Sequence, residues 1–140
     1  MRTDKLDIYV DLKELHKHLY RAQFTMMKGD RIVMGNRMLA LCEDCVSELC
    51  LANDVKDERM QHLQRCIALF TALRLNLQTC VDLRLFKSEK ATVGEERDEK
   101  LGPLVINMFE RVANIDEGLG RWRSATARAQ ATKSAPVPNE

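Results

Sequence analysis

The sequence predicts an all-α protein, and more closely an up-down-up-down four-helix bundle. Four segments of the 140-residue chain carry apolar residues at alternating spacings of three and four, which places those residues on one side of a helix. No segment shows the alternation of apolar and polar residues that is typical of a half-buried strand. The short first and second connections favour helices that run antiparallel to their neighbours.

The first helix is expected at about residues 5–26. Its apolar stripe consists of Ile8, Leu12, Leu15, Leu19, Ala22 and Met26. The sequence "KGD" (28–30) interrupts this pattern, because Gly29 disfavours helix and Asp30 is a good N-cap residue. A second helix is therefore expected to begin after Asp30.

The second helix is expected at about residues 31–52, and the third at about 57–87. Asn53 and Asp54 end the former in a short turn, and Asp57 can cap the latter. Neither proline nor glycine occurs at positions 55–87, so a long uninterrupted helix is favourable there.

The charged segment 88–102 is interpreted as a solvated loop or a frayed helical extension. Pro103 fits the first turn of a final helix, whose stripe consists of Leu104, Met108, Val112, Ile115, Leu119 and Trp122. The small, polar and proline-bearing tail is expected to be disordered. The predicted domains are thus a bundle at 1–124, which includes the 88–102 insert, and a disordered tail at 125–140.

The composition is that of an ordinary globular chain, with 45% hydrophobic and 31% charged residues. No apolar run approaches the roughly 20 residues that cross a bilayer, so no membrane partner is expected. Acidic residues stand near the N-terminus, where a signal peptide would have an apolar block. We therefore expect a cytoplasmic protein whose five cysteines are free thiols.

The sequence "LCEDCVSELC" (41–50) could be a redox pair, a metal site or core. Cys42 and Cys45 lie on the apolar side of the second helix and far from its start, which disfavours redox chemistry. A zinc site could combine Cys45 with Cys66 and His62 of the third helix. Buried cysteine more often packs as a small hydrophobic residue, so we predict core residues, no metal and no cofactor. No nucleophile stands beside a base in a catalytic pattern, and no enzyme is expected.

The third helix carries an apolar arc of about 200°, wider than the stripe of roughly 100° that a surface helix needs. This width predicts a homo-oligomer in which half of the arc faces another subunit. The alternative is a single bundle with an unusually apolar central helix. Arg74 and Arg84 fall within or beside the arc, where each needs an anionic partner. For them we consider an intersubunit ion pair or a docking role.

Three stretches carry a resemblance to a known family: "FTMMKGDRIVMGNRML" (24–39) at the first turn, "LRLNLQTCVDLRLF" (73–86) and "ERVANIDEGLGRWRSA" (110–125). Together with Tyr9 in the first helix, they resemble the four-helix bundles encoded within 23S ribosomal RNA intervening sequences. The closer branch is the accessory variability determinant (Avd) of diversity-generating retroelements. The chain departs from the family in being nearly neutral, at a formal net charge of +1, and in having Phe24-Thr25 in place of a phenylalanine–proline pair.

The resemblance implies a non-catalytic homopentamer that binds the element's reverse transcriptase and its RNA or DNA, and so supports mutagenic reverse transcription. Residues 56–87 hold six basic and three acidic residues, which several subunits in a ring would multiply into a belt for phosphates. The candidate binding residues are Arg59, Arg65, Arg74, Arg84 and Lys87 of this belt, with Arg121 and Arg123 beside Trp122. The ring of Trp122 is expected to close the bundle. The alternative functions are a related bundle that binds ribosomal or other structured RNA or an unrelated protein, and a metal-binding or enzymatic bundle.

Overall fold

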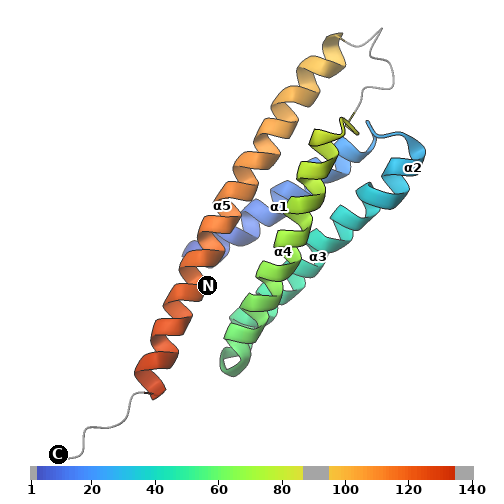
Figure 1. Ribbon diagram of the computed structural model, residues 1–140. Coiled ribbons are helices and arrows are strands. Elements are labelled where there is room, and N and C mark those ends of the chain that lie inside the picture. The colour runs from blue at the N-terminus through green and yellow to red at the C-terminus, as the bar shows by residue number, and fades with distance from the viewer. Residues whose placement is uncertain (1–2, 87–94, 135–140) are drawn as a thin grey trace, which may run out of the picture.

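The computed structural model describes residues 3–86 and 95–134, and within them it is an all-α four-helix bundle without strands (Figure 1). This confirms the predicted fold class. The second of the four rods is a composite of a short α-helix, a π-helix and a long α-helix. The elements are α1 (Thr3–Gln23), α2 (Lys28–Asp30), a π-helix (Arg31–Gly35), α3 (Asn36–Asp54), a 3₁₀ turn (Lys56–Glu58), α4 (Arg59–Asp82) and α5 (Glu95–Ser134).

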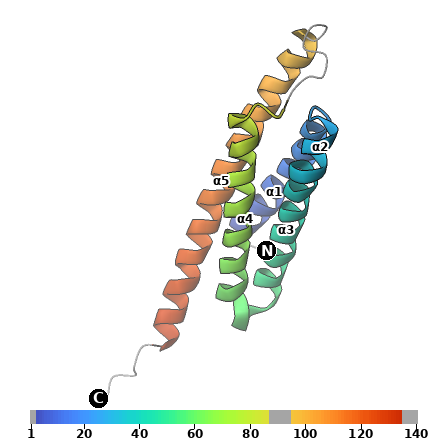
Figure 2. The ribbon, with the colours of Figure 1, turned by 45° about the vertical axis from the view of Figure 1, so that its right-hand side comes forward.

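Consecutive rods run antiparallel, so the topology is up-down-up-down (Figures 1 and 2). Helix α1 packs against α3 and α5, and α4 packs against the same two helices on the other side. Helix α5 is the longest element, with 40 residues, and it extends past the other rods at both ends (Figure 2). Among the described residues, no helix combines the length and the apolar content that a membrane span requires.

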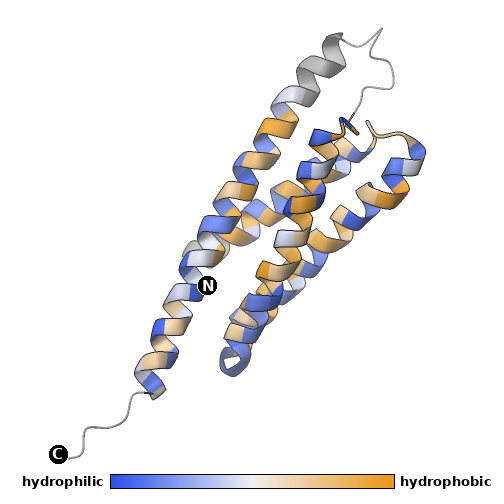
Figure 3. Ribbon diagram, viewed as in Figure 1, coloured by the Kyte–Doolittle hydropathy of each residue, from blue (hydrophilic) through white to orange (hydrophobic). Residues whose placement is uncertain are grey.

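The core is built from the apolar stripes that the sequence predicts. All six residues of the first stripe, five in α1 and Met26 just after it, are at most 1% exposed. In α5, Leu104 is only partly buried, and the rest of the stripe is at most 4% exposed: Met108, Val112, Ile115, Leu119 and Trp122. Apolar and polar bands accordingly alternate along each rod (Figure 3). Burial of one such aliphatic side chain contributes about 1.5–3 kcal/mol, so the stripes dominate the stability of the bundle.

Each of the four seams between neighbouring helices also carries a pair of ionisable side chains at its edge. The pairs are His16–Glu43 between α1 and α3, Glu48–His62 between α3 and α4, Arg74–Asp116 between α4 and α5, and Asp11–Arg111 between α1 and α5. The His16–Glu43 and Arg74–Asp116 pairs are exposed and contribute at most about 1 kcal/mol each, whereas His62 and Asp11 of the other two pairs are buried. All four pairs oppose sliding of one helix along the next, because each pair exists in only one register.

The predicted N-cap at Asp30 is wrong, because Asp30 is already helical, with φ −65° and ψ −38°. The cap is the extended residue Met27, and Gly29 lies inside the first turn. The reason is the tight turn before it, in which the Thr25 hydroxyl donates to the carbonyl of Ala22 at 2.7 Å. That turn ends α1 early enough for the next helix to start at Lys28.

Helix α4 ends at Asp82, five residues before its predicted end. Arg84 has a φ of +54°, in the left-handed region that ends a helix. The N–H of Leu85 donates to the carbonyl of Cys80 at 2.8 Å, and the N–H of Arg84 donates to Val81 at 3.1 Å. These two bonds form a Schellman motif with arginine at the position that usually holds glycine. The sequence predicted Arg84 within the apolar arc of the third helix. That prediction is wrong, because Arg84 lies exposed beyond the end of α4.

Helix α5 begins earlier and ends later than predicted. It starts at Glu95, so Pro103 lies inside the helix rather than in its first turn. It continues to Ser134, so residues 125–134 of the predicted disordered tail are helical. Alanine, the best helix former, occupies positions 125, 127, 129 and 131, and Thr126 is still buried against the bundle. The remaining parts of the predicted insert and tail, 88–94 and 135–140, lie outside the described residues.

Candidate nucleic-acid interface

Arg59 was predicted to bind phosphate, but in the structure its guanidinium forms hydrogen bonds within the bundle. Its Nε donates to the carbonyl of Ala52 at 2.8 Å, and its Nη2 donates to the carbonyl of Asn53 at 3.3 Å. Its guanidinium also lies 5.8 Å from the ring centre of Trp122. Arg59 therefore caps the last carbonyls of α3 and covers Trp122, which is 4% exposed and closes the bundle as predicted.

Arg74 and Arg121 are also paired within the chain. Arg74 forms an ion pair with Asp116 across the α4–α5 seam, so the anionic partner that the sequence required belongs to the same subunit. Arg121 donates to Glu117, one turn earlier on α5, at 2.6 Å. All four side chains are at least 39% exposed, so solvent screens both pairs and a phosphate could compete for either arginine.

The remaining predicted cations do not share one face. Arg65 is exposed on the α3 side of α4, since it follows by three residues His62, whose ring contacts Glu48 of α3. Arg123 is exposed on α5. Neither side chain forms a hydrogen bond or ion pair within the described part of the chain. Lys87 lies outside the described residues. One subunit thus does not present the predicted α4 cations as a single belt.

The strongest basic element is instead the C-terminal part of α5. Residues 118–134 hold four basic residues and no acidic one, and in Figure 3 this part of the helix alternates between polar and pale bands. Arg121 and Arg128 are seven residues apart, which places them on the same face. Lys56 and Lys133 line one shallow pocket beside Trp122. The sequence interpretation missed Arg128 and Lys133 because it assigned them to a disordered tail, although the alternating alanines could have indicated helix.

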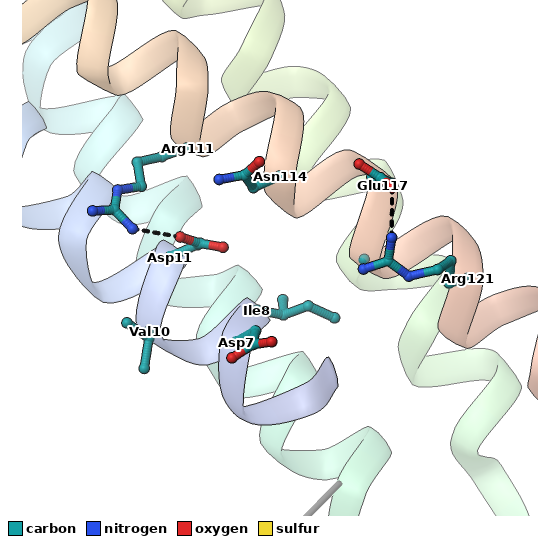
Figure 4. Close-up of a pocket in the computed structure, with 9 residues that line it drawn as sticks. Asp7, Ile8, Val10, Asp11, Arg111, Asn114, Glu117 and Arg121 are labelled. Atoms are coloured by element: carbon teal, nitrogen blue, oxygen red, sulfur yellow. Dashed lines mark hydrogen bonds and ion pairs between the residues drawn. The ribbon is translucent and has the colours of Figure 1, made fainter. Parts of the chain in front are cut away.

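A larger pocket of about 360 Å³ lies between α1 and α5 (Figure 4). Its walls are ion-paired, because Arg111 Nη1 donates to Asp11 Oδ1 at 2.7 Å and Arg121 donates to Glu117. Its floor depends on Gly118, where an added Cβ would stand 2.7 Å from Ile8 Cγ1. The charges of these walls largely neutralise one another, so the pocket offers no strong site for an ionic ligand. Its residues instead hold α1 against α5.

His18 stands at the same seam, near the cation Arg111. Its Nδ1 is buried and has no hydrogen-bond partner within the described residues. Burial lowers the pKa of His18 below its ordinary value, and the nearby Arg21 and Arg111 act in the same direction, whereas Glu14 and Asn107 oppose the shift. The position of His18 in the seam therefore favours the neutral form of its imidazole.

The cysteines Cys42 and Cys45 are fully buried core residues, as predicted. The Cys42 thiol donates to the carbonyl of Leu12 at 3.4 Å. Cys45 and Cys66 face each other, and each thiol donates to the other residue's carbonyl, at 3.7 and 3.4 Å. Burial raises the pKa of Cys42 to about 12, and the hydrogen bond with Cys66 followed by burial raises the pKa of Cys45. Cys42, Cys45 and Cys66 are packing groups of the core.

His62, the third residue of the zinc alternative, points elsewhere. Its Nδ1 lies 2.6 Å from Glu48 Oε2, and its Nε2 lies 3.4 Å from Glu58 Oε2. Both ring nitrogens thus contact carboxylates at the α3–α4 seam. In the part of the chain that the structure describes, no group of three or more His, Cys, Asp or Glu side chains could hold a metal ion.

Comparison with known proteins leaves the geometry as the guide to function: no protein-family model, no curated protein and no solved structure matches this chain.

Proposed function

We propose that the protein is a non-catalytic accessory protein of a diversity-generating retroelement, which binds the element's reverse transcriptase and its RNA or DNA. The resemblance to Avd motivates the proposal. The observation that carries it is the acid-free C-terminal part of α5, where Arg121 pairs with Glu117 but Arg123 and Arg128 form no ion pair within the described residues, because a helical array of cations binds phosphates by displacing their counterions. Phosphate contact uses the outward side of this helix, since Asp57 and Glu58 of the 3₁₀ turn lie at the same end of the bundle.

The proposal includes self-association, with five subunits as the number that the resemblance implies. Support comes from α4, on which Ile67, Leu69 and Val81 flank the core stripe and are only partly buried. Leu75 and Leu83 of the same region are 65% and 63% exposed. A neighbouring subunit would remove this apolar surface from water, and a ring would place several copies of α5 around one axis. Light scattering that gives a stable monomer at micromolar concentration contradicts this part.

The test compares charge reversals on α5 and on α4. The protein is mixed with the element's own template RNA, and the affinity is measured across a series of salt concentrations. The double variant Arg123→Glu/Arg128→Glu is expected to weaken binding by roughly tenfold or more and to flatten the salt dependence, since each lost phosphate contact reduces the slope by about one. The control is Arg65→Glu at an exposed position of α4, which is compared with the single variants Arg123→Glu and Arg128→Glu because each of the three makes the same change of charge.

Three outcomes are informative. If only the α5 variants lose affinity, phosphate binding lies on α5. If Arg65→Glu loses as much affinity as the single α5 variants, the α4 belt predicted from the sequence is the better account. If the purified protein neither co-purifies with the reverse transcriptase nor prefers the template RNA to ribosomal RNA, the retroelement function is wrong, and the alternative of a bundle for other structured RNA replaces it.

A further inference from the structure

The end of the bundle formed by the last turn of α1, α2 and the π-helix exposes an unusual amount of apolar surface. Within fourteen residues, five large apolar side chains are at least half exposed: Tyr20, Phe24, Met27, Ile32 and Val33. The rings of Tyr20 and Phe24 stack edge to face with their centres 5.0 Å apart. The Arg31 guanidinium lies 5.8 Å from the centre of the Phe24 ring, so α1 and the π-helix contribute to one continuous surface. We call these five residues and Arg31 the α1–α2 end.

The local backbone presents this surface to solvent. Ile32 and Val33 lie within the π-helix Arg31–Gly35, a rare conformation that frequently occurs at functional sites. Gly35 allows the π-helix to approach α1 closely, because an added Cβ would stand only 3.2 Å from Gln23 Cβ. Gly35 makes the close contact with α1, and the side chains of Ile32 and Val33 remain outside the core.

The charge around this surface is basic. Positions 20–37 hold four basic residues, Arg21, Lys28, Arg31 and Arg37, and one acidic residue, Asp30. The Asp30 carboxylate is near enough to α4 to contribute, after burial, to raising the pKa of Cys80 to about 11. A partner at this end therefore meets cations around an apolar centre. Such a surface favours a partner whose acidic side chains surround an apolar patch of its own.

We propose that the α1–α2 end docks an acidic amphipathic helix of a partner protein. The apolar side of such a helix covers Phe24 and Ile32, and its flanking carboxylates pair with Arg21, Lys28 and Arg31. The inference deepens the proposed function and rests on it only for the identity of that partner as the reverse transcriptase. It separates the protein contact from the phosphate contact on α5, which lies at the opposite end of the bundle (Figure 1).

Other occupants fit less well. A single-stranded nucleic acid uses aromatic faces for stacking, but Met27, Ile32 and Val33 offer no such face, and Arg31 already lies over Phe24. A second copy that docked through the same end would place its own cations against these cations. An anionic membrane surface matches the charge and is distinguished by experiment.

The test uses a paired set of substitutions at exposed apolar positions. The double variant Phe24→Ser/Ile32→Ser changes the α1–α2 end, and the matched control Leu51→Ser/Ile106→Ser changes two side chains that are 41% and 62% exposed elsewhere. Circular dichroism verifies the helix content of both. The probes are a labelled eighteen-residue amphipathic peptide of leucine and glutamate, the same peptide with lysine for glutamate, an oligouridine, vesicles of phosphatidylcholine with phosphatidylserine, and the reverse transcriptase.

The glutamate peptide is expected to bind the parent and the control, and to bind the Phe24→Ser/Ile32→Ser variant roughly tenfold or more weakly, as expected for loss of buried anchors. The lysine peptide is expected not to bind. Equal binding of the glutamate peptide to both variants overturns the inference, as does equal binding of the two peptides. Binding of oligouridine or vesicles that is lost in this variant, without peptide binding, also overturns it.

The reverse transcriptase distinguishes this inference from the proposed function. If the enzyme co-purifies equally with both variants, the proposed function stands and the docking surface is wrong. If the enzyme binds neither the parent nor the variants, while the glutamate peptide binds as expected, the docking surface stands and the proposed function is wrong.

Discussion

Two glycines of α5, Gly118 and Gly120, allow the α1–α5 contact to be measured directly. Both are helical, but an added Cβ at Gly118 would stand 2.7 Å from Ile8 Cγ1 and 3.1 Å from its Cδ1, whereas nothing lies within 4 Å of one at Gly120. Ile8 is 1% exposed, so it has little room to move. The substitution Gly→Ala should therefore have opposite effects at two positions that are only two residues apart.

The magnitudes follow from two opposing terms. Alanine in place of glycine inside a helix gains about 1 kcal/mol, and Gly120→Ala should show this gain. Gly118→Ala has the same gain but must displace a buried side chain, and overpacking of this kind costs roughly 1–3 kcal/mol. Gly118→Ala is thus expected to be less stable than Gly120→Ala by about 1–3 kcal/mol.

Urea unfolding followed by circular dichroism gives both free energies of unfolding. The same two substitutions in an Ile8→Ala background complete the design. That change removes the atoms that a Cβ at position 118 would meet, so the difference between the two glycine sites should largely disappear. If Gly118→Ala is as stable as Gly120→Ala in the parent background, α1 and α5 do not pack as closely as the structure indicates.

Further predictions concern the end of α4, the thiols and one histidine. Arg84→Gly should raise the free energy of unfolding by about 1 kcal/mol, since glycine adopts a positive φ without the steric cost of arginine; a loss of stability would contradict the left-handed cap. Cys42→Ala and Cys45→Ala should each cost on the order of 1–2 kcal/mol through the cavities they leave, as urea unfolding can show. A thiol reagent should modify Cys50, the exposed cysteine, at least several times faster than the buried thiols, and equal rates would show that the core opens readily. Because the pKa of His18 is lowered in the folded protein, the unfolded chain binds more protons, and stability should fall as pH decreases below about 6.5; His18→Gln should reduce this slope, and an unchanged slope would contradict its burial.

The fold class and the core could be predicted from the sequence because they depend on periodicity. A side chain such as Leu12 or Ile115 has only one way to leave water once its helix forms, so spacing alone identifies it. The same reasoning correctly placed Cys42, Cys45 and Trp122 in the interior. The helix ends were predicted less well, because Arg84 adopts a left-handed conformation that glycine usually takes, and because Pro103 is tolerated inside α5.

The candidate site depended on information that the sequence does not carry. Charge along the chain indicated Arg59 and Arg74 as phosphate ligands, but whether a cation is free depends on its neighbours in space. Packing of α4 against α3 and α5 gives Arg59 two backbone carbonyls and gives Arg74 the carboxylate of Asp116. The interior can be identified from local periodicity, because a side chain on the apolar side of a helix is buried whatever the helix packs against. The charges that remain available at the surface depend on the packing of the helices, because an ion pair such as Arg74–Asp116 joins residues that are distant in the chain.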